Sequence, residues 1–80
     1  MSKEQDHIVD LTSEVAPYAL VKCRLALEGV GVGQVLRFLV KDEESVRSIK
    51  VCLPFDGDEL VSVNRLEDSI TEIVARKLRD

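Results

Sequence analysis

The chain has few aromatic side chains and few residues that bind metals. Its 80 residues include no Trp, one Tyr, two Phe, two Cys and one His. Three aromatics are too few for the stacking platforms with which proteins bind single-stranded nucleic acid. His7 and the two separated cysteines, Cys23 and Cys52, do not have the spacing of a zinc site. We therefore expect no metal and no cofactor.

The chain also lacks an excess of basic residues and any long apolar run. Eleven Lys and Arg against fifteen Asp and Glu give a formal net charge of −4. This charge opposes the phosphate backbone, so nucleic acid is an unfavourable partner. No segment approaches the roughly 20 apolar residues of a membrane span, and residues 1–6 carry no apolar stretch typical of an export signal. We expect a cytoplasmic protein without membrane contact, in which both thiols stay reduced.

What the chain does contain is enough for one small core. With 45% hydrophobic and 32% charged residues, it has the composition of one globular domain. The series Gly29, Gly31 and Gly33 does not indicate a dinucleotide-binding loop, because it follows a predicted helix and precedes a predicted strand. The acidic residues show no spacing typical of an acid/base pair, so a solvated acidic rim is the simplest interpretation.

The first half of the chain predicts a strand and then an amphipathic helix. Residues 7–11 alternate in the manner of a short strand. Pro17 suits the first position of a helix, which we expect to run from there to about Glu28. We expect Gly29 to end it in a left-handed conformation. The side chains predicted to face the core are Ala19, Leu20, Cys23, Ala26 and Leu27.

The middle of the chain predicts a strand, a second helix and another strand. The first of these strands covers residues 34–40. Asp42 and the two glutamates after it place negative charge where a helix N-terminus favours it. The second helix is expected to stop near Pro54, and residues 59–65 alternate as a strand. The apolar stripe of this helix consists of Val46, Ile49 and Leu53, with Cys52 at its edge.

The last segment, Ser69 to Lys77, fits two structures. Ser69 and Glu72 match a capping box, and apolar residues then recur at helical spacing. Against a helix, the segment is rich in β-branched residues, and a strand here would form a hairpin with residues 59–65. The local sequence leaves both open. With a final strand, the order predicts two helices on one face of a small mixed sheet.

A set of short motifs resembles the TusA/SirA family of small sulfur carriers over residues 8–77. The matching positions are Asp10-Leu11, Ala16-Pro17-Tyr18-Ala19-Leu20, Asp42, Ser45-Val46-Arg47, Ile49, Glu59-Leu60 and Arg76-Lys77. The resemblance implies an α+β fold, a two-layer α/β sandwich in the order β-α-β-α-β-β, with two helices on one face of a four-stranded mixed sheet. It makes residues 1–80 a single domain with a core at about 7–77, and Ser69 to Lys77 a strand. It also implies a protein partner such as a sulfurtransferase or a cysteine desulfurase.

The chain departs from the family in the motif that carries the chemistry. Members have Cys-Pro-x-Pro at the start of the first helix and pass sulfur as a cysteine persulfide. Here Ala16 matches the cysteine and Ala19 the second proline, so only Pro17 remains. Thr12-Ser13 replaces a usual Arg-Gly. A cysteine at a helix N-terminus is activated because the helix dipole favours its thiolate, and Ala16 cannot do this and is also a poor N-cap. Such clustered changes favour natural divergence over replacement of the nucleophile alone.

Two hypotheses of function follow. In the first, the protein has no catalytic residue and acts by protein–protein interaction, through a surface at the start of the first helix formed by Ala16, Pro17, Tyr18 and Lys22. In the second, it is an active carrier in which Cys52 replaces the missing nucleophile, so whether it is an enzyme stays open. Cys23 is expected to be a packed core thiol. Lys22 and Arg24 lie on the polar side of the helix, either simply solvated or facing an acidic partner. An RNA-associated role is disfavoured by the acidic charge.

Overall fold

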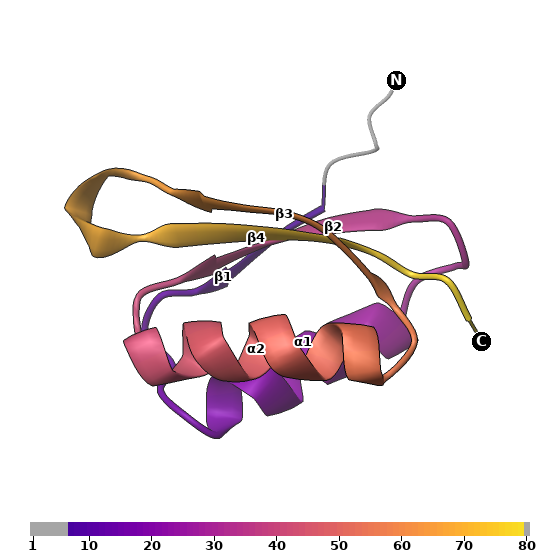
Figure 1. Ribbon diagram of the computed structural model, residues 1–80, viewed down its shortest axis with the longest axis horizontal. Helices are drawn as coiled ribbons and strands as arrows, with labels where there is room; N and C mark the ends of the chain where they lie inside the picture. Colours follow the sequence, from indigo (N-terminus) through magenta and orange to yellow (C-terminus); the bar gives the residue numbers. More distant parts are fainter. Residues whose placement is uncertain (1–6, 80) are drawn as a thin grey trace.

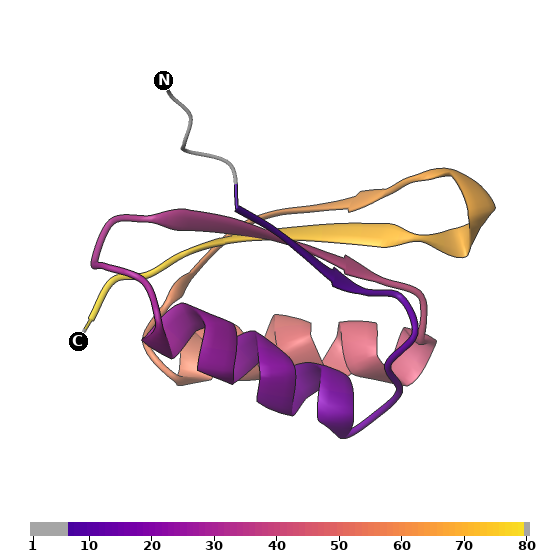
Figure 2. The same ribbon diagram turned by 180° about the vertical axis from the view of Figure 1, so that it is seen from behind.

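A computed structural model describes residues 7–79, which form a helix layer packed on a sheet (Figure 1). The strands are β1 (His7–Leu11), β2 (Val35–Val40), β3 (Glu59–Arg65) and β4 (Thr71–Arg76), and a short 3-10 turn, η1 (Glu67–Ser69), lies between the last two. The helices are α1 (Tyr18–Glu28) and α2 (Glu43–Phe55). Both cover the same face of the sheet, as the opposite view also shows (Figure 2). The expected α+β sandwich in the order β-α-β-α-β-β is confirmed.

The sheet is mixed and has the strand order β1-β2-β4-β3. β1 and β2 are parallel, whereas β4 is antiparallel to both β2 and β3. This arrangement decides the ambiguous last segment. As a strand, β4 completes hydrogen bonding with neighbours on both of its sides, and these long-range pairs outweigh the local capping signal. The short turn before it, η1, does not continue as a helix, because Asp68 and Ser69 have positive φ.

The hydrophobic core lies between the two layers. Phe38 of β2 and Ile73 of β4 have no exposed surface and form its centre. The predicted inner face of α1 is confirmed, with Leu20 and Ala26 only partly buried. The predicted stripe of α2 is confirmed as well. The core cluster comprises Leu11, Ala19, Cys23, Leu27, Leu36, Phe38, Val40, Val46, Ile49, Leu53, Ile73 and Ala75.

Polar side chains cover the middle of the sheet face that carries no helix. Arg37 of β2 pairs with Glu72 of β4 at 3.2 Å, and Arg76 of β4 pairs with Glu59 of β3 at 2.7 Å. These pairs cross between neighbouring strands, where opposite charges stabilise a sheet modestly. This face is therefore suited to solvent, whereas the apolar face is closed by the helices.

Several predicted element ends shift by a residue, and the predicted left-handed cap is wrong. Gly29 has a right-handed conformation, with φ −84° and ψ −2°, because its N–H continues the helical bonding to the carbonyls of Leu25 and Ala26. Positive φ occurs instead at Gly33 (93°), before β2, and at Gly57 (98°), after α2. Pro17 is the N-cap rather than the first helical residue. Within residues 7–79, no helix is long and apolar enough to cross a membrane.

Candidate interaction surface on the helix layer

Three residues of the predicted surface lie where the chain enters α1. Ala16 is half-buried, and Pro17 and Tyr18 are exposed. Pro17 is the N-cap and makes no side-chain capping bond, so α1 begins without a cap from its own sequence. Lys22 lies one helical turn beyond Tyr18 and is also exposed. The structure thus brings the four predicted residues together at one end of α1.

Asp42 ties this entry segment to the start of α2. Its Oδ2 accepts hydrogen bonds from the Ala16 N–H at 3.0 Å, the Ser45 N–H at 3.1 Å and the Ser45 hydroxyl at 2.6 Å. The Ser45 hydroxyl above all, followed by the Ala16 N–H, lowers the pKa of the Asp42 carboxyl. The sequence predicted Asp42 at a helix N-terminus, and this is confirmed. It did not predict the bond to Ala16, because the two residues are 26 positions apart.

The cations of α1 that the sequence assigned to solvent have partners within the chain. The Lys22 ammonium pairs with Glu14 at 2.6 Å, and the Arg24 guanidinium pairs with Asp56, which follows α2, at 2.8 Å. A second Arg24 nitrogen donates to the other Asp56 oxygen at 3.2 Å, and Asp56 raises the pKa of Arg24. Both cations remain exposed, as predicted. The Ala16–Asp42 bond joins the N-terminal ends of the two helices, and the Arg24–Asp56 pair joins the second half of α1 to the C-terminal end of α2, so α1 and α2 run in the same direction.

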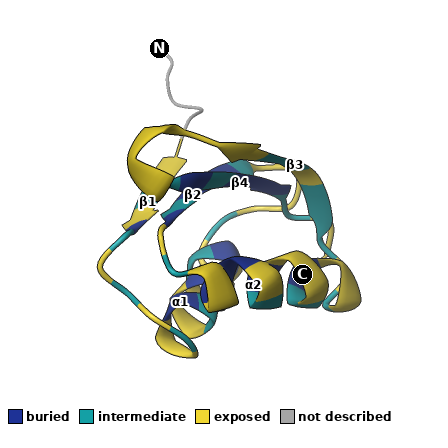
Figure 3. Ribbon diagram, turned by 60° about the vertical axis from the view of Figure 1, so that its left-hand side comes forward, coloured by how far each residue is buried: buried dark blue, intermediate teal, exposed yellow. Residues whose placement is uncertain are grey.

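The side of the helix layer that faces away from the sheet is largely exposed (Figure 3), and several large hydrophobic residues of α1 and α2 are among the exposed ones. We call this set the helix-face patch, and it consists of Tyr18, Val21 and Leu25 of α1 with Val51 and Phe55 of α2. Tyr18 is 62% exposed and Phe55 is 87% exposed, whereas Phe38, the third aromatic of the chain, is completely buried. Two of three aromatics therefore contribute little to the core of this small domain, although aromatics bury the most surface when they are packed inside.

Most of this patch was not predicted from the sequence. Val21 and Leu25 lie three and seven residues after Tyr18, and this spacing places all three on one side of a helix. That side is opposite the predicted core arc. The signal was thus present as a second apolar stripe on the same helix.

The two cysteines lie in different environments. Cys23 is fully buried in the inner face of α1, and burial raises the pKa of its thiol to about 12, against a smaller opposing effect of Arg24. It is therefore protonated at neutral pH and, as predicted, part of the core. Cys52 is only partly buried and lies late in α2, away from the helix N-terminus. Both are free thiols.

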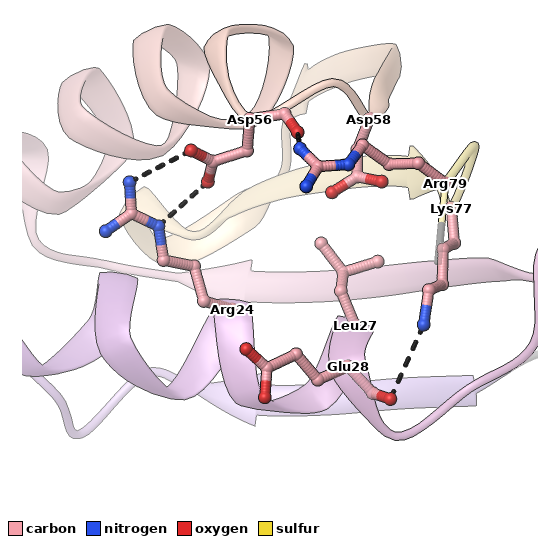
Figure 4. A pocket seen from close by; sticks show the side chains of 7 residues that line it. All are labelled: Arg24, Leu27, Glu28, Asp56, Asp58, Lys77 and Arg79. Carbon is pink, nitrogen blue, oxygen red and sulfur yellow. Dashed lines mark hydrogen bonds and ion pairs between the residues drawn. The ribbon is translucent and has the colours of Figure 1, made fainter.

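A pocket of about 300 Å³ lies at the C-terminal ends of both helices (Figure 4). Its three cations already have partners. Lys77 donates to the carbonyl oxygens of Glu28, at 3.4 Å, and Val30, at 2.8 Å, and Arg79 donates to the Asp56 carbonyl oxygen. With Arg24 bound to the Asp56 carboxylate, the pocket is the place where the C-terminal segment joins the two helix ends. Its lining is Arg24, Leu27, Glu28, Asp56, Asp58, Lys77 and Arg79.

The described residues do not assemble a metal site. Within residues 7–79, no three His, Cys, Asp or Glu side chains gather where they could hold a metal ion. His7 begins β1 and is exposed. The candidate functional features are therefore the entry to α1, the helix-face patch and the Cys52 thiol.

Comparisons with known proteins agree with the fold. The family model described as "Sulfurtransferase TusA" matches residues 7–77. A "Putative sulfur carrier protein" of Archaeoglobus fulgidus is 35% identical over 72 residues, which cover 90% of this chain and 97% of the relative. Another of the same description and organism is 27% identical over 74 residues, covering 92% of this chain and 84% of the relative. The crystal structure of a SirA-like protein from Desulfitobacterium hafniense superposes with a TM-score of 0.79, over 90% of this chain and 97% of that one. Its identity is 18%, so this likeness concerns the fold alone.

Proposed function

Because this chain belongs to the TusA family of sulfurtransferases, we propose that it binds a protein partner in or near a sulfur relay without carrying sulfur itself. The observation that carries this proposal is the helix-face patch, above all the exposed aromatics Tyr18 and Phe55. Buried aromatic anchors dominate the energy of many protein–protein interfaces. An exposed patch of this kind is a candidate for such contact.

The absence of a nucleophile before α1 supports binding rather than carriage. By the family resemblance, Ala16 stands where the sulfur-carrying cysteine is expected. A methyl side chain offers no electron pair to a persulfide donor, so this position has no sulfur chemistry. The backbone around it is nevertheless held in place, since Asp42 binds the Ala16 N–H. The segment therefore has a fixed backbone but, by the resemblance, no reactive group.

The proposed partner is a cysteine desulfurase or another sulfurtransferase. Ala16, Pro17, Tyr18 and Lys22 would meet this partner at the start of α1, and the remaining residues of the patch would extend the contact along the helix layer. Lys22 is paired with Glu14 but still half-exposed, so it can add charge at the rim of the interface.

The test is a titration of a cysteine desulfurase with the wild-type protein and with Tyr18→Ala. We expect Tyr18→Ala to weaken binding by about tenfold or more, since it removes an anchor, with little change in the unfolding midpoint. Ile8→Ala is a matched control, because Ile8 of β1 has the same 62% exposure but lies in the other layer. Unchanged affinity for Tyr18→Ala, or an equal loss for Ile8→Ala, would contradict the proposed surface.

A second candidate function is sulfur transfer through Cys52. Of the two thiols, Cys52 is the one that reaches the surface. In this reaction, the Cys52 thiolate would attack the outer sulfur of a donor persulfide, forming a new S–S bond and releasing the donor cysteine as a thiolate. Rapid alkylation of Cys52 at neutral pH would support this function, with Cys52→Ser identifying the labelled site. Slow labelling of both cysteines would rule it out.

A further inference from the structure

The carbonyls of Val15 and Pro17 accept backbone bonds from α1, but the segment that leads into the helix has no side-chain hydrogen bond of its own that would hold the Ala16 N–H. Pro17 has no N–H, Ala16 has no polar side chain, and the N-cap makes no side-chain bond. Among the described residues, the Ala16–Asp42 bond is the one hydrogen bond that a side chain makes to the backbone of residues 15–18. The donor lies before α1, and the acceptor lies between β2 and α2.

The carboxylate that accepts this bond is itself fixed. Ser45, which is 1% exposed, donates both its N–H and its hydroxyl to the same Oδ2 that receives the Ala16 N–H. Three donors around one oxygen determine both the rotamer of Asp42 and the direction in which it faces the entry segment. Hydrogen bonds to an ionised carboxylate are also stronger than bonds between neutral groups.

We propose that Asp42 is a positioning residue for docking, because it fixes the backbone at Ala16 and so sets the direction in which Tyr18 is presented. This inference rests on the proposed function, in which Tyr18 anchors the partner. An entry segment that samples other conformations would be competent to bind for only a fraction of the time. The apparent affinity is then the intrinsic affinity multiplied by that fraction.

Two substitutions separate positioning from the capping of α2. Asp42→Ser keeps a residue that caps helices well, but its shorter side chain does not reach the Ala16 N–H. Asp42→Asn keeps the length and an oxygen that can occupy the Oδ2 position, and it removes the charge. Three quantities are measured for each variant: the hydrogen-exchange rate of the Ala16 amide by NMR, the unfolding midpoint, and the affinity for the cysteine desulfurase used with Tyr18→Ala.

For Asp42→Ser, we expect Ala16 exchange to accelerate about tenfold and binding to weaken about three- to tenfold, while the exchange protection of α2 is retained. For Asp42→Asn, which keeps the bond without its charge, we expect smaller changes in exchange and affinity than for Asp42→Ser. Protected Ala16 in Asp42→Ser would overturn the proposal. Unchanged affinity of Asp42→Ser despite faster Ala16 exchange would also overturn it. An equal loss of affinity in Asp42→Asn, with the Ala16 amide still protected, would do the same, because the charge of Asp42 rather than the position of the segment would then determine binding.

A failure of the proposed function is distinguishable from a failure of this inference. If the wild-type protein does not bind the desulfurase, the proposed function fails for that partner. The exchange rate of the Ala16 amide, which needs no partner, still shows whether Asp42 holds the entry segment.

Discussion

The two faces of α1 carry side chains of the same apolar character but differ in burial. Leu27 on the inner face is 3% exposed, and Leu25 on the outer face is 60% exposed. The inner face packs on the sheet, whereas the outer face contacts no other layer. Burial of the inner face therefore contributes to the free energy of folding. The other face is free to contribute to binding instead, so hydrophobicity alone does not reveal the purpose of a residue in this helix.

The largest expected effect is on stability, and it is seen when the same Leu→Ala substitution is made on each face of α1. Leu27→Ala should lower the free energy of unfolding by about 2–5 kcal/mol, because it leaves a cavity in the core. Leu25→Ala should change it by less than about 0.5 kcal/mol, because the side chain is already in water. Denaturant unfolding of both variants measures the difference. Similar losses in the two variants would erase the distinction between the faces.

Alkaline pH tests the inner face through Cys23. Below the unfolded pKa of about 9, the thiol is protonated in both states and stability is unaffected. Between there and the folded pKa of about 12, the unfolded chain loses the proton and the folded chain keeps it, so stability falls as pH rises. The slope attributable to Cys23 is at most about 1.4 kcal/mol per pH unit. To obtain this slope, the free energy of unfolding of Cys23→Ala at each pH is subtracted from that of the wild-type protein. Parallel curves for the two proteins would refute a contribution of Cys23 to the pH dependence.

The outer face is tested next through α2. Phe55→Ala should weaken binding to the cysteine desulfurase by about tenfold, because the side chain is an exposed aromatic that gains burial only in a complex. Its free energy of unfolding should stay within about 0.5 kcal/mol of the wild-type value. Phe38→Ala is the contrasting control and should cost about 3–5 kcal/mol of stability. If Phe55→Ala destabilised the fold and left the affinity unchanged, Phe55 would stabilise the folded domain rather than bind the partner.

The smallest expected effect concerns Lys22 at the edge of the outer face. Lys22→Gln should change stability by less than about 0.5 kcal/mol, because its pair with Glu14 is exposed. We expect a two- to threefold loss of affinity at low salt, which disappears as the salt concentration rises. A loss that persists at high salt would show that Lys22 acts through something other than its charge.

Much of the fold could be predicted from periodicity. The inner face of α1 and the stripe of α2 follow directly from apolar spacing, and both are confirmed. Residues 71–76 were undecided locally, because capping and β-branched signals coincide there. Their strand form depends on pairing with β2 and β3, which no local window contains. The left-handed conformation predicted for Gly29 is wrong because a helix can also end in right-handed geometry. The turn that follows the helix decides between the left-handed and the right-handed ending.

The candidate site was predictable only in part. The motif residues Ala16, Pro17 and Tyr18 pointed to the start of α1, where Pro17 and Tyr18 are exposed and Ala16 is half-buried. The Ala16–Asp42 and Arg24–Asp56 bonds could not be foreseen, because they join residues 26 and 32 positions apart. Such pairs depend on how the helices lie side by side, which is a property of the packed fold.

The most direct test of the central claim is native mass spectrometry of the protein mixed with a cysteine desulfurase and cysteine. A family member with an intact Cys-Pro-x-Pro motif is the positive control for sulfur transfer. Our account predicts a complex of the desulfurase with the unmodified protein. The absence of any complex, or a gain of one sulfur atom that a reductant reverses, would contradict it.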